Sequence, residues 1–240
     1  HNVLSRHQTL YDTLDWSYKL LDPQQQRLFR RLGVFLGGWT LEAALAIGMA
    51  ESQGALSVLQ TGISTWGVNN PEVAPLHTAP PLSLQDDMLE QMESLMDESL
   101  VKRISLEERP FEENKEPRFH FLETIREYAL GQLEACGERE DMQRRHATYY
   151  LALVERVEPD LSGHEQSIAV SMLAREQDNL RAALSWAIER DEAELVQRMC
   201  GALGLFWEAH TQFQEAHRWI DAALNMAQDT TLTIRAKLLM

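Results

Sequence analysis

The sequence predicts a mainly α-helical protein with one β-hairpin near its middle and antiparallel helical hairpins after it. Apolar residues recur at helical spacing through most of the 240 residues. A short stretch near residue 120 alternates as a half-buried strand. The segment after it carries helix pairs with a weak repeat of about 34 residues. Together these observations favour a helical protein with one small β element.

The first two helices are predicted from their apolar faces and from the residues that end one helix and begin the next. One face of the first helix carries Leu10, Leu14, Tyr18 and Leu21. Asp22 and Pro23 then end this helix and begin another, with Asp22 as N-cap and Pro23 at the first helical position. Gln25 stands where a capping box needs it. We therefore expect a tight break between two helices at residue 22.

A third short helix is predicted after a glycine turn. The second helix carries Leu28, Phe29 and Leu32. Gly37 and Gly38 supply the backbone freedom that a tight exit requires. Thr40 is the expected N-cap of the third helix. Three short helices at this spacing predict a compact cluster.

An insertion and a β-hairpin complete the first predicted domain. Residues 49–85 are rich in Pro and Asn and predict a loop that contains Trp66. A helix over 86–99 follows, with a stripe of Met88, Met92, Leu95 and Met96. Residues 118–122 predict a strand with Phe119 and Phe121 on one face. Helices followed by a hairpin are the layout of a winged-helix domain, predicted for residues 1–122.

Residues 123–240 are predicted to be wholly helical, in antiparallel hairpins. The apolar stripes comprise Ile125, Tyr128, Ala129 and Leu133, then Met142, His146, Tyr149, Tyr150, Leu153 and Val157. Further helices are expected over 178–190, 193–210 and 212–228. Leu203, Gly204, Trp207, Phe213, Ala216, Ile220 and Ala223 fit the tetratricopeptide (TPR) pattern, as Ala182 and Trp186 do more weakly. Gly204 would let two helices approach closely, the aromatics would fill the space between repeats, and the last repeat would be truncated. An irregular helical bundle is the alternative.

The residues that carry chemistry in enzymes are not arranged here in a catalytic pattern. Cys136 and Cys200 predict two buried, reduced thiols, and His146 on an apolar stripe predicts a core histidine. No metal-ligand spacing or phosphate-binding loop is present, so no catalytic, cofactor or metal site is predicted in this chain. No apolar run is long enough to span a bilayer, and we expect a soluble, cytoplasmic excerpt of a longer protein.

Charge weighs against DNA contact by the predicted winged helix. The net charge is −15, and residues 49–117 hold thirteen acidic and four basic side chains. The helix before the hairpin, which commonly reads the major groove in such folds, carries Asp86, Asp87, Glu90, Glu93, Asp97 and Glu98. The hairpin tip adds five glutamates. A phosphate backbone would be repelled by both elements.

Four blocks in order resemble a known family. They are "TLDWSYKLLDPQQQRLFRRLGVFLGGWTLEAA", "MLEQMESLMDESLVKR", "RFHFLETIREYALGQLEACGE" and "RRHATYYLAL" with "DNLRAALSWA". The chain resembles the region after the nucleotide-binding domain in bacterial STAND-class predicted ATPases, the AfsR- and LuxR-like transcriptional regulators related to NB-ARC proteins. The resemblance covers nearly the whole chain outside residues 49–85.

The resemblance implies a non-catalytic regulatory module for signal transduction. The winged helix would dock on an upstream ATPase domain that binds ATP or ADP and Mg²⁺, and the TPR-like helices would bind an inducer or protein partner. A Met-His-Asp motif of the family's eukaryotic relatives aligns with Phe121, Leu122 and Glu123. Leu122 cannot bond a phosphate, whereas Glu123 suits the first turn of a helix. Trp16 and Trp39 are the outer residues expected to meet the ATPase domain if they are not wholly buried.

The partner groove is expected on the first helix of each repeat. Its concave positions would be Arg198, Leu205, Glu208 and Arg235, although ordinary solvated helix faces look the same in sequence. Three other functions stay open from the residues. They are a DNA-binding winged-helix regulator, a TPR scaffold without nucleotide control, and a chain that itself hydrolyses ATP.

Overall fold

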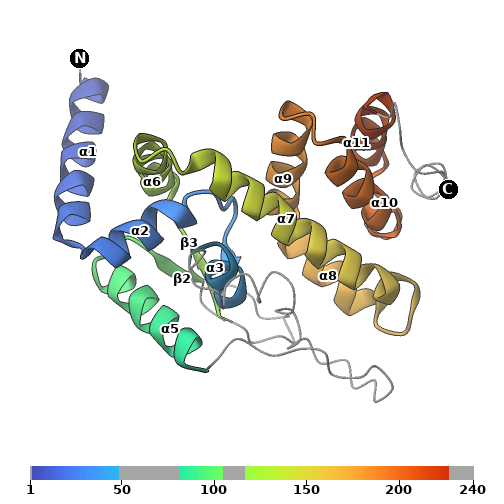
Figure 1. Ribbon diagram of the computed structural model, residues 1–240, viewed down its shortest axis with the longest axis horizontal. Helices are drawn as coiled ribbons and strands as arrows, with labels where there is room; N and C mark the ends of the chain where they lie inside the picture. The colour runs from blue at the N-terminus through green and yellow to red at the C-terminus, as the bar shows by residue number, and fades with distance from the viewer. Residues whose placement is uncertain (1, 49–81, 105–116, 227–240) are drawn as a thin grey trace. The chain divides into compact units, whose positions relative to one another are not determined.

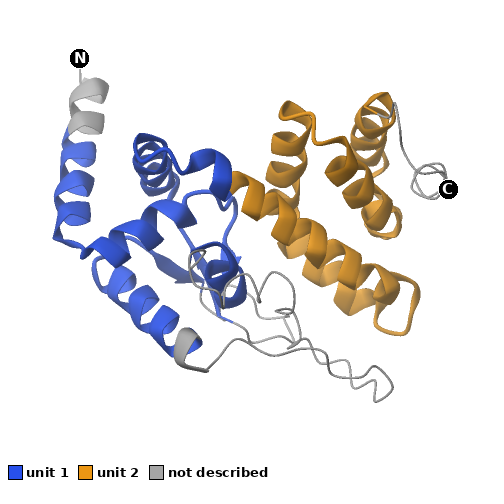
Figure 2. Ribbon diagram, viewed as in Figure 1, with its two compact units in different colours: residues 1–142 blue, residues 143–240 orange. Residues whose placement is uncertain are grey.

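The computed structural model describes residues 2–48, 82–104 and 117–226. It divides into two compact units, residues 1–142 and residues 143–240, coloured separately in Figure 2. In the described ranges both units are mainly helical, as predicted, and one small β-sheet lies in the first unit (Figure 1). None of the helices in these ranges is long and apolar enough to cross a membrane.

Helices α1 (Asn2–Leu20) and α2 (Pro23–Leu32) meet at the predicted break. The Asp22 carboxylate accepts hydrogen bonds from the backbone N–H groups of Gln24 and Gln25, at 2.8 and 2.9 Å. Gln25 Oε1 accepts in turn from the Asp22 N–H at 3.0 Å, so the capping box is confirmed. Leu14 and Tyr18 of α1 are buried, as is Leu21 just after it, whereas Leu10 on the same predicted face is 42% exposed.

The glycine turn and the third helix are also confirmed. Gly37 and Gly38 have φ angles of 79° and 113°, which other residues rarely adopt. Helix α3 (Leu41–Gly48) begins where predicted, and Thr40 Oγ1 accepts from the Ala43 N–H at 3.2 Å. The turn also leads into a strand, β1 (Trp39–Thr40), which the sequence did not predict because two residues show no readable alternation.

The sheet has three antiparallel strands. Strand β3 (Arg118–His120) lies in the middle, with β1 on one side and β2 (Lys102–Ile104) on the other. Phe119 faces Trp39 across one ladder and Arg103 across the other. A hairpin pairing is therefore present as predicted, although β3 ends at His120 and does not include the predicted Phe121. Strand β1 joins this pair to the N-terminal helices. Residues 105–116, with the predicted acidic hairpin tip, lie outside the described residues.

Helix α5 (Leu82–Asp97) precedes β2 and begins four residues before the predicted start at Asp86. Its predicted stripe faces the core, since Met88, Met92 and Leu95 are fully buried. The rest of the predicted insertion, including Trp66, lies outside the described residues.

An aromatic cluster fills the core of the first unit. The Phe29 ring lies 5.2 Å from Phe121, 5.6 Å from Tyr18 and 6.3 Å from Tyr128, between centroids. Trp39 packs edge-on against Phe121 at 4.9 Å. Such tilted and edge-to-face pairs stabilise a core beyond their buried area. The cluster joins α1, α2, the end of β3 and α6 (Glu123–Ala135) into one body.

Helix α6 lies in the first compact unit, whereas the predicted domain boundary lay before it. Tyr128 makes α6 part of the first core, and Glu138, just after α6, accepts hydrogen bonds from Arg30 Nε at 3.0 Å and Arg31 Nε at 2.7 Å. The first compact unit consequently extends to residue 142 instead of ending at 122. The pattern of helices alone could not assign α6, because its partners lie about a hundred residues earlier in the chain.

Arg31 is a buried cation that joins three elements. Its side chain is 5% exposed, and besides Glu138 it donates from Nη1 to the carbonyl oxygen of Gly48 at 2.9 Å. This places a positive charge at the C-terminal end of α3, where the helix dipole favours it. Burial raises the pKa of Glu138, but hydrogen bonds from Arg30 and Arg31 outweigh it and hold that pKa below its ordinary value.

The second unit stacks the remaining helices. They are α7 (Arg139–Val157, which begins in the first unit), the 3₁₀ turn η2 (Glu158–Ser162), α8 (Gln166–Arg175), α9 (Gln177–Glu189), α10 (Ala193–Ala209) and α11 (Phe213–Asn225). The predictions for α9 to α11 are confirmed, whereas α8 and η2 were not predicted. The turns before α10 and α11 contain Asp191 and Thr211, with φ angles of 57° and 54°.

Three expectations for side chains of the helical region are wrong. Trp207 and Ala223 are buried as expected, but Phe213 is 56% exposed and fills no inter-helix space among the described residues. A Cβ added at Gly204 would meet nothing within 4 Å, so no described helix approaches closely there. Cys200 is buried, but Cys136 is exposed because it caps the solvent end of α6.

We predict that Glu138→Ala lowers the free energy of unfolding by about 3 kcal/mol, because it leaves Arg31 charged and buried without its carboxylate. Chemical denaturation of the 240-residue chain measures this loss. Glu134→Ala is the matched control, since the Glu134–Arg139 ion pair is exposed and should contribute about 0.5 kcal/mol or less. Equal losses in the two variants would contradict the role given to Glu138.

Candidate functional site

The predicted partner-binding residues share one exposed stripe of α10. Arg198, Leu205 and Glu208 follow one another at helical spacing and point away from the buried side of the helix, which carries Val196, Met199, Cys200, Leu203, Phe206 and Trp207. Leu205 is 42% exposed. The structure therefore brings three of the four predicted residues together, and Arg235 lies outside the described residues.

Arg198 is engaged in an ion pair with α7. Its Nε and Nη2 atoms each lie 2.7 Å from one carboxylate oxygen of Glu155, and Nη1 lies 3.4 Å from Glu194 on its own helix. The hydrogen bonds to Glu155 raise the pKa of Arg198 above its ordinary value, against a smaller lowering by burial. Sequence reasoning missed Glu155 because 43 residues separate the partners.

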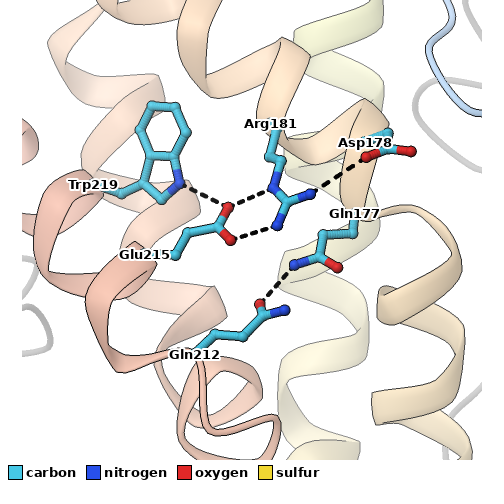
Figure 3. A network of polar contacts seen from close by, with 6 residues as sticks. All are labelled: Gln177, Asp178, Arg181, Gln212, Glu215 and Trp219. Carbon is cyan, nitrogen blue, oxygen red and sulfur yellow. Dashed lines mark hydrogen bonds and ion pairs between the residues drawn. The ribbon is translucent and has the colours of Figure 1, made fainter.

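A second arginine joins α9 to α11 in the same manner (Figure 3). Arg181 Nε and Nη2 lie 2.7 and 2.6 Å from the two carboxylate oxygens of Glu215, and Nη1 lies 3.4 Å from Asp178. Trp219 Nε1 donates to the same Glu215 at 3.2 Å. The partners are 34 residues apart, which is the repeat period that the sequence suggested.

These two bidentate pairs, here called the arginine clamps, fix α10 and α11 within the second unit. In each clamp a carboxylate of another helix binds the guanidinium through two oxygens. A second acid, one turn away on the arginine's own helix, lies 3.4 Å from it. The four side chains of the bidentate pairs are between 16% and 39% exposed. Each clamp therefore contributes modestly to stability and mainly specifies the geometry of the helices.

A buried polar chain lies in the core of the same unit. Tyr150 donates to Glu176 at 2.9 Å, and the Asn179 amide donates to the same carboxylate oxygen at 3.0 Å. The Asn179 carbonyl lies 3.3 Å from His146 Nε2, which must donate because its partner can only accept. The prediction of a satisfied core histidine is confirmed, and burial lowers the pKa of His146 from 6.5 to about 4.

The residues predicted to dock on another domain divide into exposed and buried ones. Trp16 is 64% exposed and Leu122 is 43% exposed, whereas Trp39 and Phe121 are buried and cannot meet a partner directly. Glu123 lies in the first turn of α6 as expected, with its carboxylate 2.8 Å from Arg126 Nη2. That hydrogen bond holds the pKa of Glu123 below its ordinary value.

The outer face of α5 is acidic, and its carboxylates have no partner among the described side chains. The acidic side chains on it and just beyond it are all exposed, namely Asp86, Asp87, Glu90, Glu93, Asp97 and Glu98. None of them makes an ion pair or hydrogen bond to another described side chain. Within the ranges that the structure describes, no group of three or more His, Cys, Asp or Glu residues could hold a metal ion.

Comparison with known proteins finds relatives among transcriptional regulators. The chain is 29% identical, over 222 residues, to proteins of Mycobacterium bovis and Mycobacterium tuberculosis that are named HTH-type transcriptional regulators. The match covers 92% of this chain and 21% of each relative, so the chain spans about a fifth of their length. No protein-family profile matches the chain, and no solved structure matches it significantly.

We predict that His146 makes the second unit sensitive to acid. Its pKa is about 4 in the folded chain and 6.5 when unfolded, so protons favour the unfolded state, and stability that is present above pH 6.5 is lost as the pH falls toward 4. Between about pH 7 and about pH 4 the native chain should lose about 3 kcal/mol more than His146→Gln does. Urea denaturation at both pH values measures this.

The exposed His217 provides the control for this comparison. His217→Gln should keep the pH dependence of the native chain. Parallel pH profiles for His146→Gln and the native chain would contradict the assignment.

Proposed function

We propose that the chain is the regulatory segment of a larger transcriptional regulator of the STAND ATPase type. In this proposal the first unit is a winged helix that docks on an ATPase domain elsewhere in the protein. The second unit is a TPR-like sensor that binds an inducer or a protein partner. ATP or ADP and Mg²⁺ belong to the other domain, and this chain itself performs no catalysis.

The relatives support a regulatory role. They are named HTH-type transcriptional regulators, and about four fifths of their length lies outside the matched region. That length leaves ample room for the DNA-binding and ATPase domains that the proposal requires. The four sequence blocks that resemble STAND regulators all fall in the two described units.

One observation favours docking over DNA binding for the first unit. Its helix α5 precedes the β2–β3 hairpin, in the place of a DNA-reading helix, and turns outward an acidic face that pairs with no described side chain. Neutralisation of phosphates supplies most of the affinity of DNA-binding proteins, and this face would repel them. A DNA-binding winged helix is therefore the second candidate, and the relatives' name is what favours it.

An apolar face on α1 suits contact with another domain. Trp16 and Leu20 lie one turn apart and are 64% and 56% exposed, on the side of α1 away from Leu14 and Tyr18. Large exposed apolar side chains of this kind commonly mark protein contacts. Because α1 is fixed to the aromatic core, a partner that binds this face holds the whole first unit.

We predict that Trp16→Ala in the full-length protein raises basal ATP turnover by about tenfold, because a contact that restrains the ATPase domain is lost. A phosphate-release assay without inducer measures this. The 240-residue variant should keep its stability within about 0.5 kcal/mol, since the residue is exposed. Leu89→Ala, at a 38% exposed leucine of α5, is the control and should leave turnover unchanged. Unchanged turnover in Trp16→Ala would contradict docking through α1.

A further inference from the structure

The exposed stripe of α10 has a definite chemical character. Besides Arg198, Leu205 and Glu208 it includes Glu194 and Gly201, so that each residue lies about one turn after the last. Arg198 and Gly201 are half-buried, and the other three are exposed. Gly201 leaves a gap in the row of side chains immediately before the exposed leucine. A helix position without a side chain is where the backbone of another helix can approach most closely.

The arginines near this stripe are already neutralised. Glu155 holds Arg198 through both carboxylate oxygens, and Glu194 lies behind it. Arg144 on α7 lies 2.6 Å from Glu192, just before α10, and its guanidinium also stacks over Trp186. An anionic ligand would have to break one of these pairs before it gained a cation, so the surface does not favour phosphates, nucleotides or acidic peptides.

The uncompensated groups are an apolar side chain and a carboxylate. Leu205 is 42% exposed, and Glu208, one turn further on, makes no side-chain hydrogen bond or ion pair to any described residue. Glu194 at the other end is 80% exposed and reaches Arg198 only at 3.4 Å. The stripe therefore presents a leucine next to Glu208, whose side chain has no partner among the described residues, and Glu194 at its other end keeps only the 3.4 Å contact to Arg198.

We propose that this stripe receives a cationic amphipathic helix of a protein partner. An apolar residue of that helix covers Leu205 beside Gly201, and Lys or Arg residues flank it and face Glu208 and Glu194. Helix-on-helix docking of this kind is a common recognition mode. The inference rests on the proposed sensor role of the second unit and specifies the chemistry of its partner.

A designed amphipathic Leu/Lys helical peptide, labelled with a fluorophore, tests this chemistry on the 240-residue chain. Anisotropy titrations should show saturable binding that weakens by about fivefold in Leu205→Ala and in Glu208→Gln. A Leu/Glu peptide of the same length and pattern should not bind. Failure of the Leu/Lys peptide to bind, or equal binding of the Leu/Glu peptide, would overturn the inference.

Matched variants on α5 separate this surface from general attraction to an acidic protein. Leu89→Ala and Glu90→Gln make the same chemical changes at exposed residues, and both should change the affinity by less than about twofold. Equal losses at α5 and α10 would show non-specific attraction and would overturn the inference. The outcome is distinguishable from failure of the proposed function, since the Trp16→Ala effect on ATP turnover does not involve α10.

Discussion

The first unit depends on one carboxylate, Glu138, which accepts hydrogen bonds from two consecutive arginines of α2. Arg31 is buried and also caps α3, so the pair connects the end of α6 with α2 and α3. Together with the aromatic cluster around Phe29, this constraint makes α6 part of the first body and moves the unit's limit to residue 142. A unit held in this way can transmit a contact on α1 as a single body, which is what docking requires.

In the second unit, an apolar core and the arginine clamps hold the helices in place. Its apolar core is continuous along α10, and the arginine clamps fix α10 against α7 and α11 against α9. The clamps are partly exposed and contribute less to stability than to geometry. The carboxylates of the clamps also neutralise two guanidinium groups that would otherwise attract anions. The same ion pairs therefore have two effects. They specify how the helices stack, and they leave the stripe of α10 apolar and acidic for the proposed partner.

Local features were predictable and distant partners were not. The capping box at Asp22, the turn at Gly37 and Gly38 and the buried methionines of α5 are encoded within a few residues, and all are confirmed. The clamps, the Glu138 pair and strand β1 depend on residues between 34 and about a hundred positions apart, which a single sequence does not connect. Among the candidate site residues, Leu205 and Glu208 are exposed, and their place in a partner groove stays a prediction. Arg198 was predicted as a position of the partner groove, and its ion pair with Glu155 was not predicted because 43 residues separate the two.

We propose that this chain works through protein contacts and that its first unit does not read DNA. The acidic face of α5 is the physical basis of that claim, and a single titration addresses it. Fluorescence anisotropy of a random DNA duplex with the 240-residue chain at low salt should show no binding. Binding that is measurable at low salt and falls steeply as salt is added would contradict the claim, because it would show that the chain neutralises phosphates despite that face.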